Sequence, residues 1–386
     1  MKKTYALSVI AIAFSACVND DKYDWESDFA DKTATDTLHI AINYDGDNAS
    51  VTGDDYGYVS ISGADVTVKS NTNKFLQLTL SGTTTDGSLL IYSWKKLGIK
   101  LNGANINNVD GPAINNQCGK ALYITTASGT TNMLSDGSSY AEAPVNALGE
   151  SIDQKATLFS EGQIHFGGAG TLNISGNAKN GIASDDYVVF EGGTVNVSVA
   201  ATGTNGIKVN DGFTILGGTV TIDVKADGAR GIKNDARTTI TGGILSITTS
   251  GDCKIEETDG VKDTTSCAGI KSDSLFTMTA GTLNITSTGD GGKGINCSQN
   301  IEMNGGTLNV STKGNNVLSK PKAVKSDTGI ILSGGSFTAT TEKSWACDNG
   351  YESENESDAE IAKKRVTIIG TPTTVYLTKK TVNVIF

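Results

Sequence analysis

The stretch that decides the fold is GIKVNDGFTILGGTVTI at residues 206–222, which returns 25 residues later as GIKNDARTTITGGILSI at residues 231–247. Two markers recur together, a Gly-Ile pair and a Gly-Gly-Thr-like turn. The Gly-Ile copies begin at Gly181, Gly206, Gly231, Gly269 and Gly294, with Ala323 as a weaker sixth copy. The turn copies begin at Gly192, Gly217, Gly242, Ala280, Gly305 and Gly334, with the same steps of 25, 25, 38, 25 and 29 residues. Because both markers keep these unequal steps, the chain is a repeat protein.

Aligning the copies produces columns of aliphatic residues, which predict the fold class. One column holds Ile182, Ile207, Ile232, Ile270, Ile295 and Val324, and another holds Phe190, Ile215, Ile240, Met278, Met303 and Leu332. Within a copy the apolar spacing is two, as in Val195 and Val197, which is the period of a strand. The Leu-x-x-Leu-x-Leu pattern of leucine-rich repeats is absent. We therefore predict an all-β parallel β-helix with rungs of about 25 residues, stacked about 4.8 Å apart.

The remaining segments are interpreted around this repeat. Residues 38–386 form the β-helix domain, in which residues 38–100 supply an N-terminal cap and the first rungs and residues 345–386 a C-terminal cap. Such caps are needed because an open solenoid end exposes unpaired strand edges. The 13 additional residues between Asp252 and Ala268 leave the register of the later copies intact. They are therefore predicted to form an outward loop over residues 252–268.

The N-terminus has the pattern of an exported lipoprotein. Lys2 and Lys3 precede an apolar stretch too short to span a bilayer, and small residues then lead to Cys17. Residues 1–16 are read as a signal peptide and Cys17 as the lipid-bearing residue. Residues 17–37 are strongly acidic and are read as a solvated tether. We expect an outer-membrane lipoprotein, displayed at the cell surface.

Composition and charge exclude several classes of protein. The 386 residues contain 46 Gly but only 4 Pro, which argues against a disordered Gly/Pro-rich chain. The formal net charge is −11, so nucleic acid is a poor partner. The chain has only two His and no CxxC motif, which argues against a zinc site. Cys253 and Cys267 flank the predicted loop, and a disulfide across its base is plausible.

An acidic column follows each predicted strand and suggests calcium. It contains Asp185, Asp235, Asp273 and Asp327, with Asp186 and Asp211 beside it. Oxygen ligands on adjacent rungs suit Ca²⁺. Asp227 and Asp290, each four residues before a repeat Gly, are expected to complete such sites from the facing turn. The alternative is that these side chains only bind the backbone of their own turns.

A basic column lies beside the acidic one. It consists of Lys208, Lys233, Lys271 and Lys325, each two residues before an Asp or Asn, and the period of two places both columns on one strand face. One interpretation is a lattice of exposed Lys–Asp pairs, each contributing little stability. The other is a cationic stripe that accepts the carboxylates of a uronic-acid polymer. Neutral sugars usually pack on aromatic rings. Trp94 and Trp345 could serve this purpose, but they are equally consistent with residues that close the ends of the solenoid.

The order of motifs resembles a known family. Leu101-Asn102-Gly103, Leu134-Ser135-Asp136-Gly137 and Gly170-Thr171-Leu172-Asn173-Ile174 precede the repeated Gly-Ile-x-Ser-Asp and Gly-Gly-Thr copies. This order is similar to that of a bacterial family of extracellular carbohydrate-binding proteins, over about residues 38–386. The resemblance implies a right-handed, pectate-lyase-like β-helix that binds calcium and plant cell-wall glycans, including acidic ones, without established catalysis.

Three functions are compatible with these patterns. We favour a non-catalytic, calcium-dependent polysaccharide-binding protein for acidic pectins. A polysaccharide lyase is the first alternative, with calcium acidifying the proton and a basic residue removing it, and Arg230 and Arg237 flank Asp235. A catalytic constellation should interrupt the repeat, however, and only the 252–268 loop does. The second alternative is a structural surface stalk or adhesin.

Overall fold

The computed structural model describes residues 37–146, 149–258 and 260–386. The predicted signal peptide, the predicted lipidation site Cys17 and all but the last residue of the predicted tether lie outside the described residues. Within the described part of the chain, no helix is long and apolar enough to cross a membrane. In the described residues the regular secondary structure is β-strand except for the short helix α2 (Asp358–Lys364), so the all-β prediction is confirmed.

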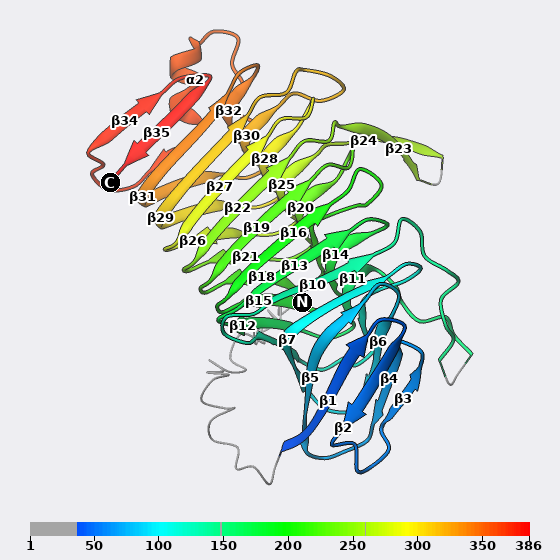
Figure 1. Cartoon of the computed structure of the whole chain (residues 1–386). Helices are drawn as coiled ribbons and strands as arrows, with labels where there is room; N and C mark the ends of the chain where they lie inside the picture. The colour runs from blue at the N-terminus through cyan, green and yellow to red at the C-terminus, as the bar shows by residue number, and fades with distance from the viewer. Residues whose placement is uncertain (1–36, 147–148, 259) are drawn as a thin grey trace, which may run out of the picture.

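Each repeat forms one rung of a parallel β-helix, as predicted (Figure 1). In one rung the chain passes through β14 (Asn180–Ser184), β15 (Tyr187–Phe190) and β16 (Thr194–Val199). The next rung repeats this path in parallel register, with Ile182 opposite Ile207 and Val195 opposite Val220. The 25-residue period therefore sets both the strand pairing and the contents of the core.

Two large sheets, counted over the described residues, form the walls. The twelve-stranded sheet contains β3 (Val59–Ser62), β4 (Asp65–Ser70), β6 (Ser88–Ser93), β8 (Ile114–Asn116), β11 (Ala156–Ser160), β14, β17 (Ile207–Val209), β20 (Arg230–Asn234), β25 (Ala268–Ser272), β28 (Lys293–Cys297), β30 (Lys322–Ser326) and β32 (Trp345–Asp348). The second sheet has 21 strands and bends around the solenoid, because long strands such as β29 pair with the strands of two walls.

The 21-stranded sheet supplies two of the three walls. Its strands are β1 (Thr37–Asp45), β2 (Asn48–Thr52), β5 (Phe75–Thr84), β7 (Leu97–Asn108), β9 (Leu122–Thr126), β10 (Thr131–Asp136), β12 (Ile164–Gly168), β13 (Thr171–Gly176), β15, β16, β18 (Gly212–Ile215), β19 (Thr219–Val224), β21 (Thr238–Ile240), β22 (Ile244–Thr249), β26 (Phe276–Met278), β27 (Thr282–Ser287), β29 (Ile301–Thr312), β31 (Ile330–Thr341), β33 (Thr367–Ile368), β34 (Thr374–Leu377) and β35 (Thr381–Ile385).

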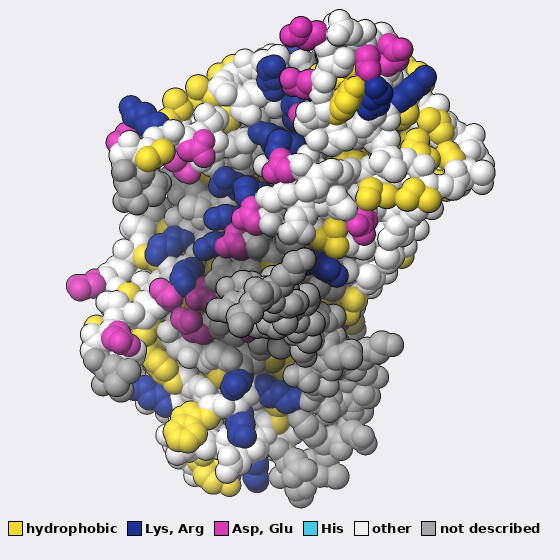
Figure 2. All heavy atoms as spheres, turned by 180° about the vertical axis from the view of Figure 1, so that it is seen from behind, with side chains coloured by type: hydrophobic (Ala, Val, Ile, Leu, Met, Phe, Trp, Pro, Cys, Tyr) yellow, Lys and Arg dark blue, Asp and Glu magenta, His cyan; other side chains and the backbone are white. Residues whose placement is uncertain are grey.

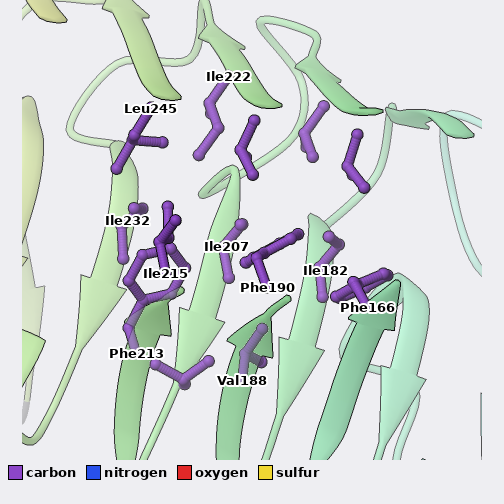
Figure 3. Packing of buried hydrophobic residues seen from close by; sticks show 14 of the residues in the cluster. Phe166, Ile182, Val188, Phe190, Ile207, Phe213, Ile215, Ile222, Ile232 and Leu245 are labelled. Carbon is purple, nitrogen blue, oxygen red and sulfur yellow. The ribbon is translucent and has the colours of Figure 1, made fainter. Parts of the chain in front are cut away.

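The predicted aliphatic columns line the interior (Figure 3). Ile182, Ile207 and Ile232 are fully buried and lie on successive rungs. Phe166 and Phe190 stack with ring centroids 4.7 Å apart, so aromatic residues continue the same column toward the N-terminus. Burying one such side chain contributes about 1.5–3 kcal/mol, so the ladders stabilise the whole solenoid.

The 13 additional residues form an antiparallel hairpin of β23 (Lys254–Thr258) and β24 (Val261–Thr265), which projects from the solenoid (Figure 1). The twelve-stranded sheet continues past it, with Ile232 opposite Ile270. Cys253 and Cys267 flank the hairpin as two free thiols, so the disulfide suggested by their spacing is absent from this structure. The Sγ of Cys253 contacts Val317 O, whereas the Sγ of Cys267 is directed to Ala226 O and Asp252 O.

Both ends of the solenoid are covered by antiparallel elements. At the N-terminal end, β1 pairs with β2 and β3 pairs with β4. At the C-terminal end, β34 and β35 form a hairpin that pairs antiparallel with β31, and α2 lies beside it. Antiparallel pairing at the ends prevents further rungs from adding to the exposed strand edges.

Candidate functional site

The outer surface of the twelve-stranded sheet, here called the twelve-stranded face, carries most of the predicted polar residues. Lys208 lies opposite Lys233 on the next strand, and Lys233 lies opposite Lys271. After Asn296, the column continues at Lys325. Each Lys alternates with buried residues along its strand, so its side chain points outward. Figure 2 shows Lys and Arg side chains gathered in a line along the molecule. We call Lys208, Lys233, Lys271 and Lys325 the cationic stripe.

The stripe is only partly neutralised by carboxylates. Lys271 forms an ion pair with Asp273, and Lys325 forms one with Asp327. These two members follow the first interpretation, exposed Lys–Asp pairs. For Lys208 and Lys233, no carboxylate of the described residues lies within the 4.0 Å of an ion pair. Two neighbouring ammonium groups without counter-ions are available to an anionic ligand.

Sequence reasoning missed further cations beside the stripe. Arg230, Lys293 and Lys322 occupy another column of the same sheet, one residue before the repeat Gly or its Ala323 equivalent. Lys293 donates hydrogen bonds to Ser266 Oγ and Ser319 Oγ at 2.6 and 2.9 Å. Burial, aided by neighbouring cations, lowers the pKa of Lys293 to about 8. Aligning the residue before each repeat Gly would have found this column.

The predicted acidic column is present, and one of its members lies in a cluster. The carboxylates of Asp153, Glu161 and Asp185 all have an oxygen within 4.8 Å of one another, and we call them the acidic cluster. Lys155 Nζ lies 2.6 Å from Asp153 Oδ2 and 2.5 Å from Asp185 Oδ2. Burial and the charges of Asp185 and Asp153 raise the pKa of Glu161. The cluster is therefore crowded with negative charge, with one ammonium between its members.

The oxygens of the acidic cluster suit a calcium ion. Ca²⁺–oxygen distances of 2.3–2.6 Å allow ligand oxygens to lie up to about 5 Å apart, and the oxygens of the acidic cluster lie within 4.8 Å of one another. Asp185 was predicted as a ligand, whereas Asp153 and Glu161 were not. Glu161 directly continues the acidic column one rung earlier, since Ser160 pairs with Ser184. Asp153 lies where the 25-residue period is interrupted, so spacing alone does not reveal it.

The other predicted ligands lie at separate places. Asp186 accepts hydrogen bonds from Gln163 and, at 2.9 Å, from the backbone N of Tyr187. Burial, together with the charge of Asp211, raises the pKa of Asp186. These two residues lie on adjacent rungs and remain near each other, as the sequence predicts. Asp235 is exposed at the end of β20, in line with Asp273 and Asp327.

Asp227 and Asp290 do not face the acidic column, so this prediction is wrong. Asp227 Oδ1 accepts a hydrogen bond from the backbone N of Asp252, and Asp290 Oδ1 accepts one from Asn315 N. Both turns precede the strands of the twelve-stranded sheet, whereas the acidic column follows them. A five-residue strand such as β20 separates the two sets by about 16 Å, too far to share an ion. Both side chains accept from backbone N–H groups, as the alternative interpretation expects, but these groups belong to the next rung and not to their own turns.

The N-terminal end of the twelve-stranded face contains a hollow of about 830 Å³. We call it the aromatic hollow, because Tyr58, Tyr92 and Trp94 line it together with polar residues. Trp94 is 77% exposed. On the first strands of this face, Tyr92 lies opposite Lys69. Gln117 lies on the rung that follows Tyr92. This end of the face therefore differs chemically from the cationic stripe.

Comparison with known proteins identifies the family. A family model described as carbohydrate-binding domain-containing protein matches residues 62–236 and 224–316, which include the face just described. The chain belongs to the carbohydrate-binding domain-containing family. The resemblance stated from the motifs is thus confirmed at the level of the family. Among curated proteins, no sequence matches.

A solved structure is similar to this member of the carbohydrate-binding domain family. It is described as the polysaccharide lyase-like protein from C. thermocellum, as a gadolinium derivative. The likeness has a TM-score of 0.54 and 25% sequence identity, and it covers 70% of this chain and 96% of that chain. The two comparisons together support an interaction with polysaccharide.

The lyase alternative centres on two arginines of this carbohydrate-binding domain. Arg230 begins β20, and Arg237 follows its end, where Asn234 Nδ2 donates to Arg237 O. Nε of Arg230 is buried and has no hydrogen-bond partner in the described structure. The family description favours binding, whereas the description of the structural neighbour is lyase-like.

Proposed function

We propose that this protein binds an acidic polysaccharide along the twelve-stranded face without cleaving it. The observation that carries the proposal is the pair Lys208 and Lys233, which lie on adjacent strands without a carboxylate partner in the described structure. The chain as a whole carries a net charge of −11, so a local cationic surface is conspicuous. Uronate carboxylates spaced along a polymer are suitable counter-ions for such a row. Pectic polymers such as polygalacturonate are the ligands we infer.

Exchange of the two lysines tests this function. We expect Lys208→Gln/Lys233→Gln to bind polygalacturonate at least tenfold more weakly, because two unpaired cations contact the polymer. Affinity electrophoresis through gels containing polygalacturonate measures the change. The control is Lys225→Gln/Lys262→Gln, which removes the same charge at exposed positions away from the stripe. Equal retention of the stripe variant and the wild type would contradict the proposal, and chain shortening of the polymer would favour the lyase.

Calcium is the second part of the proposal. We propose that Asp153, Glu161 and Asp185 hold one Ca²⁺, which requires Lys155 to leave its present position between the carboxylates. The raised pKa of Glu161 supports this, because a divalent cation relieves repulsion among crowded carboxylates. Bound calcium would supply a positive charge beside the cationic stripe, where polymer carboxylates are expected.

Removal of calcium should lower the melting temperature of the protein. We expect added Ca²⁺ to raise the melting temperature, since a ligand at 100 times its Kd stabilises the folded state by about 2.7 kcal/mol. Chelation should reverse the shift, and Asp185→Asn should abolish it. Asp358→Asn, at an exposed carboxylate near the C-terminus, is the matched control. An unchanged melting temperature together with metal analysis that finds no calcium would sink this part of the proposal.

Surface display completes the proposed function. Lipidation of Cys17 would hold the β-helix at the outer membrane, with the acidic residues up to residue 37 as a spacer. Fractionation of cells into membrane and soluble protein checks this anchoring. Held at the cell surface, the twelve-stranded face would capture polymer outside the cell.

A further inference from the structure

The aromatic hollow has the composition of a sugar-binding site. Its lining residues are Tyr58, Lys69, Ser70, Asn71, Tyr92, Trp94, Gln117, Val145 and Asn146. They include aromatic rings, hydroxyl and amide groups and one ammonium, but no carboxylate. Ligand pockets combine apolar walls with a few convergent polar groups in this way. The C–H face of a pyranose packs on an aromatic ring, and its hydroxyl groups need donors and acceptors at the rim.

Tyr58, one of the aromatic residues of the hollow, is held in place before any ligand arrives. Tyr56 and Tyr58 stack with ring centroids 5.6 Å apart and an interplanar angle of 14°. The loop that carries them is fixed by Asp54, whose carboxylate accepts hydrogen bonds from Tyr58 N and Val59 N at 2.8 and 2.9 Å. Tyr58 O in turn accepts from Lys69 N at 2.8 Å, which ties the loop to the sheet. A preorganised surface loses little conformational entropy on binding.

The polar groups of the hollow are positioned by the same strands. Lys69 lies opposite Tyr92, and its Nζ is 5.7 Å from the centroid of the Tyr92 ring. Gln117 Nε2 donates to Asn115 Oδ1 at 2.6 Å, which fixes the orientation of this lining amide. Trp94 follows β6 and is 77% exposed, far more than a residue needed for the core. A large exposed indole beside positioned polar groups offers the kind of surface on which a sugar ring packs.

We propose that the aromatic hollow binds an uncharged sugar ring stacked on Trp94, as a subsite distinct from the cationic stripe. This subsite extends the proposed function. It rests on that function in one respect only, namely that the ligand is a polysaccharide. The hollow and the stripe lie on one face. From β6 to β17 there are four strand steps, through β8, β11 and β14, or about 19 Å along the solenoid. One polymer with both neutral and acidic units can therefore contact both sites.

Tryptophan fluorescence tests this subsite directly. The chain has three Trp, and Trp25→Phe in the full chain leaves Trp94 and Trp345. Trp345 is packed against Arg365 and Lys379 and serves as a constant background. Neutral hexasaccharides of β-1,4-linked glucose, xylose and galactose are the probes. We expect at least one to shift the emission saturably, and we expect Trp94→Ala to weaken its binding at least tenfold, measured by calorimetry, with partial rescue in Trp94→Phe.

The controls separate this subsite from the acidic-polymer site. Tyr376→Ala removes another exposed aromatic ring, in the C-terminal cap, and should bind the neutral probe as the wild type does. Trp94→Ala should retain polygalacturonate binding within twofold, whereas Lys208→Gln/Lys233→Gln should retain the neutral probe. No response of the Trp25→Phe protein to any neutral hexasaccharide overturns the inference and leaves the proposed function intact. Loss of both ligands in Trp94→Ala overturns the separation of the two subsites.

Discussion

Exchange of Gly181 for Ala is expected to lower the free energy of unfolding by about 3 kcal/mol, the upper end of the usual cost of overpacking. A Cβ atom on Gly181 would lie 2.4 Å from Val197 Cγ1 and 2.9 Å from Gly206 O. Real Cβ contacts are longer, and neither neighbour is the end of a flexible side chain. The rung must therefore distort, and its two neighbours must follow.

The same close approach occurs in every Gly-Ile copy. The corresponding Cβ on Gly206, Gly231, Gly269 and Gly294 would lie between 2.0 and 2.5 Å from the aliphatic residue 16 positions later. The sixth copy shows how the chain accommodates a side chain. There Ala323 replaces the Gly, and the residue 16 positions later is the small Ala339. Both are buried, so the smaller partner leaves room for the additional methyl group.

This internal comparison predicts a rescue. In a Val197→Ala background, the cost of Gly181→Ala should fall by at least half, because the nearest clashing atom is gone. Urea unfolding of the two single variants, the double variant and the wild type gives the coupling free energy. Gly119→Ala is the control, since Gly119 has no heavy atom within 4 Å of a built Cβ and no positive φ. Additive costs in the double variant would contradict the explanation.

The second large effect concerns the C-terminal cap. Arg365 is 1% exposed and donates from Nη1 to Asp348 Oδ1 at 2.7 Å, while its guanidinium lies 4.2 Å from the centroid of the Trp345 ring. Lys322 forms a further ion pair with Asp348. One buried carboxylate is therefore the ion-pair partner of two cations. We expect Asp348→Ala to lower the free energy of unfolding by about 3–5 kcal/mol, because it leaves both cations without an anionic partner.

Acid sensitivity provides an independent check of this ion-pair network. Burial alone would raise the pKa of Asp348, but the hydrogen bond and charge of Lys322 and the charge of Arg365 hold it below its usual value. The resulting stability is present above the unfolded-state pKa of about 3.9 and is lost as the pH falls through the lower folded-state pKa. The difference between the wild type and Asp348→Ala should therefore shrink below about pH 4.

Thermal unfolding from pH 7 to pH 3 measures this dependence. Asp358→Ala is the matched control, because its partner Lys379 and Asp358 itself are both about half exposed. Exposed ion pairs contribute little to stability, so the free energy of unfolding of this control should remain within about 1 kcal/mol of the wild type at every pH. A similar loss in both variants would show that the network does not determine the stability of the cap.

The sequence by itself determined the solenoid, the contents of its core and the alignment of the four lysines on one face. This was possible because each rung contacts mainly the rungs before and after it, so one 25-residue period specifies strand register and side-chain direction together. Lys208 and Lys233 lie side by side for this reason, as do Ile207 and Ile232.

Only the tertiary structure decided what lies where the period is interrupted. Asp153 reaches Glu161 and Asp185 from an irregular segment, and the aromatic hollow combines a loop before β3 with the ends of β6 and β8. Asp227 was expected to reach the acidic column from a facing turn, but residue spacing does not show which turns of a rung face each other. The spacing of the repeat shows which residues lie next to each other on successive rungs. Contacts between loops depend on the path of each loop, which the repeat does not specify.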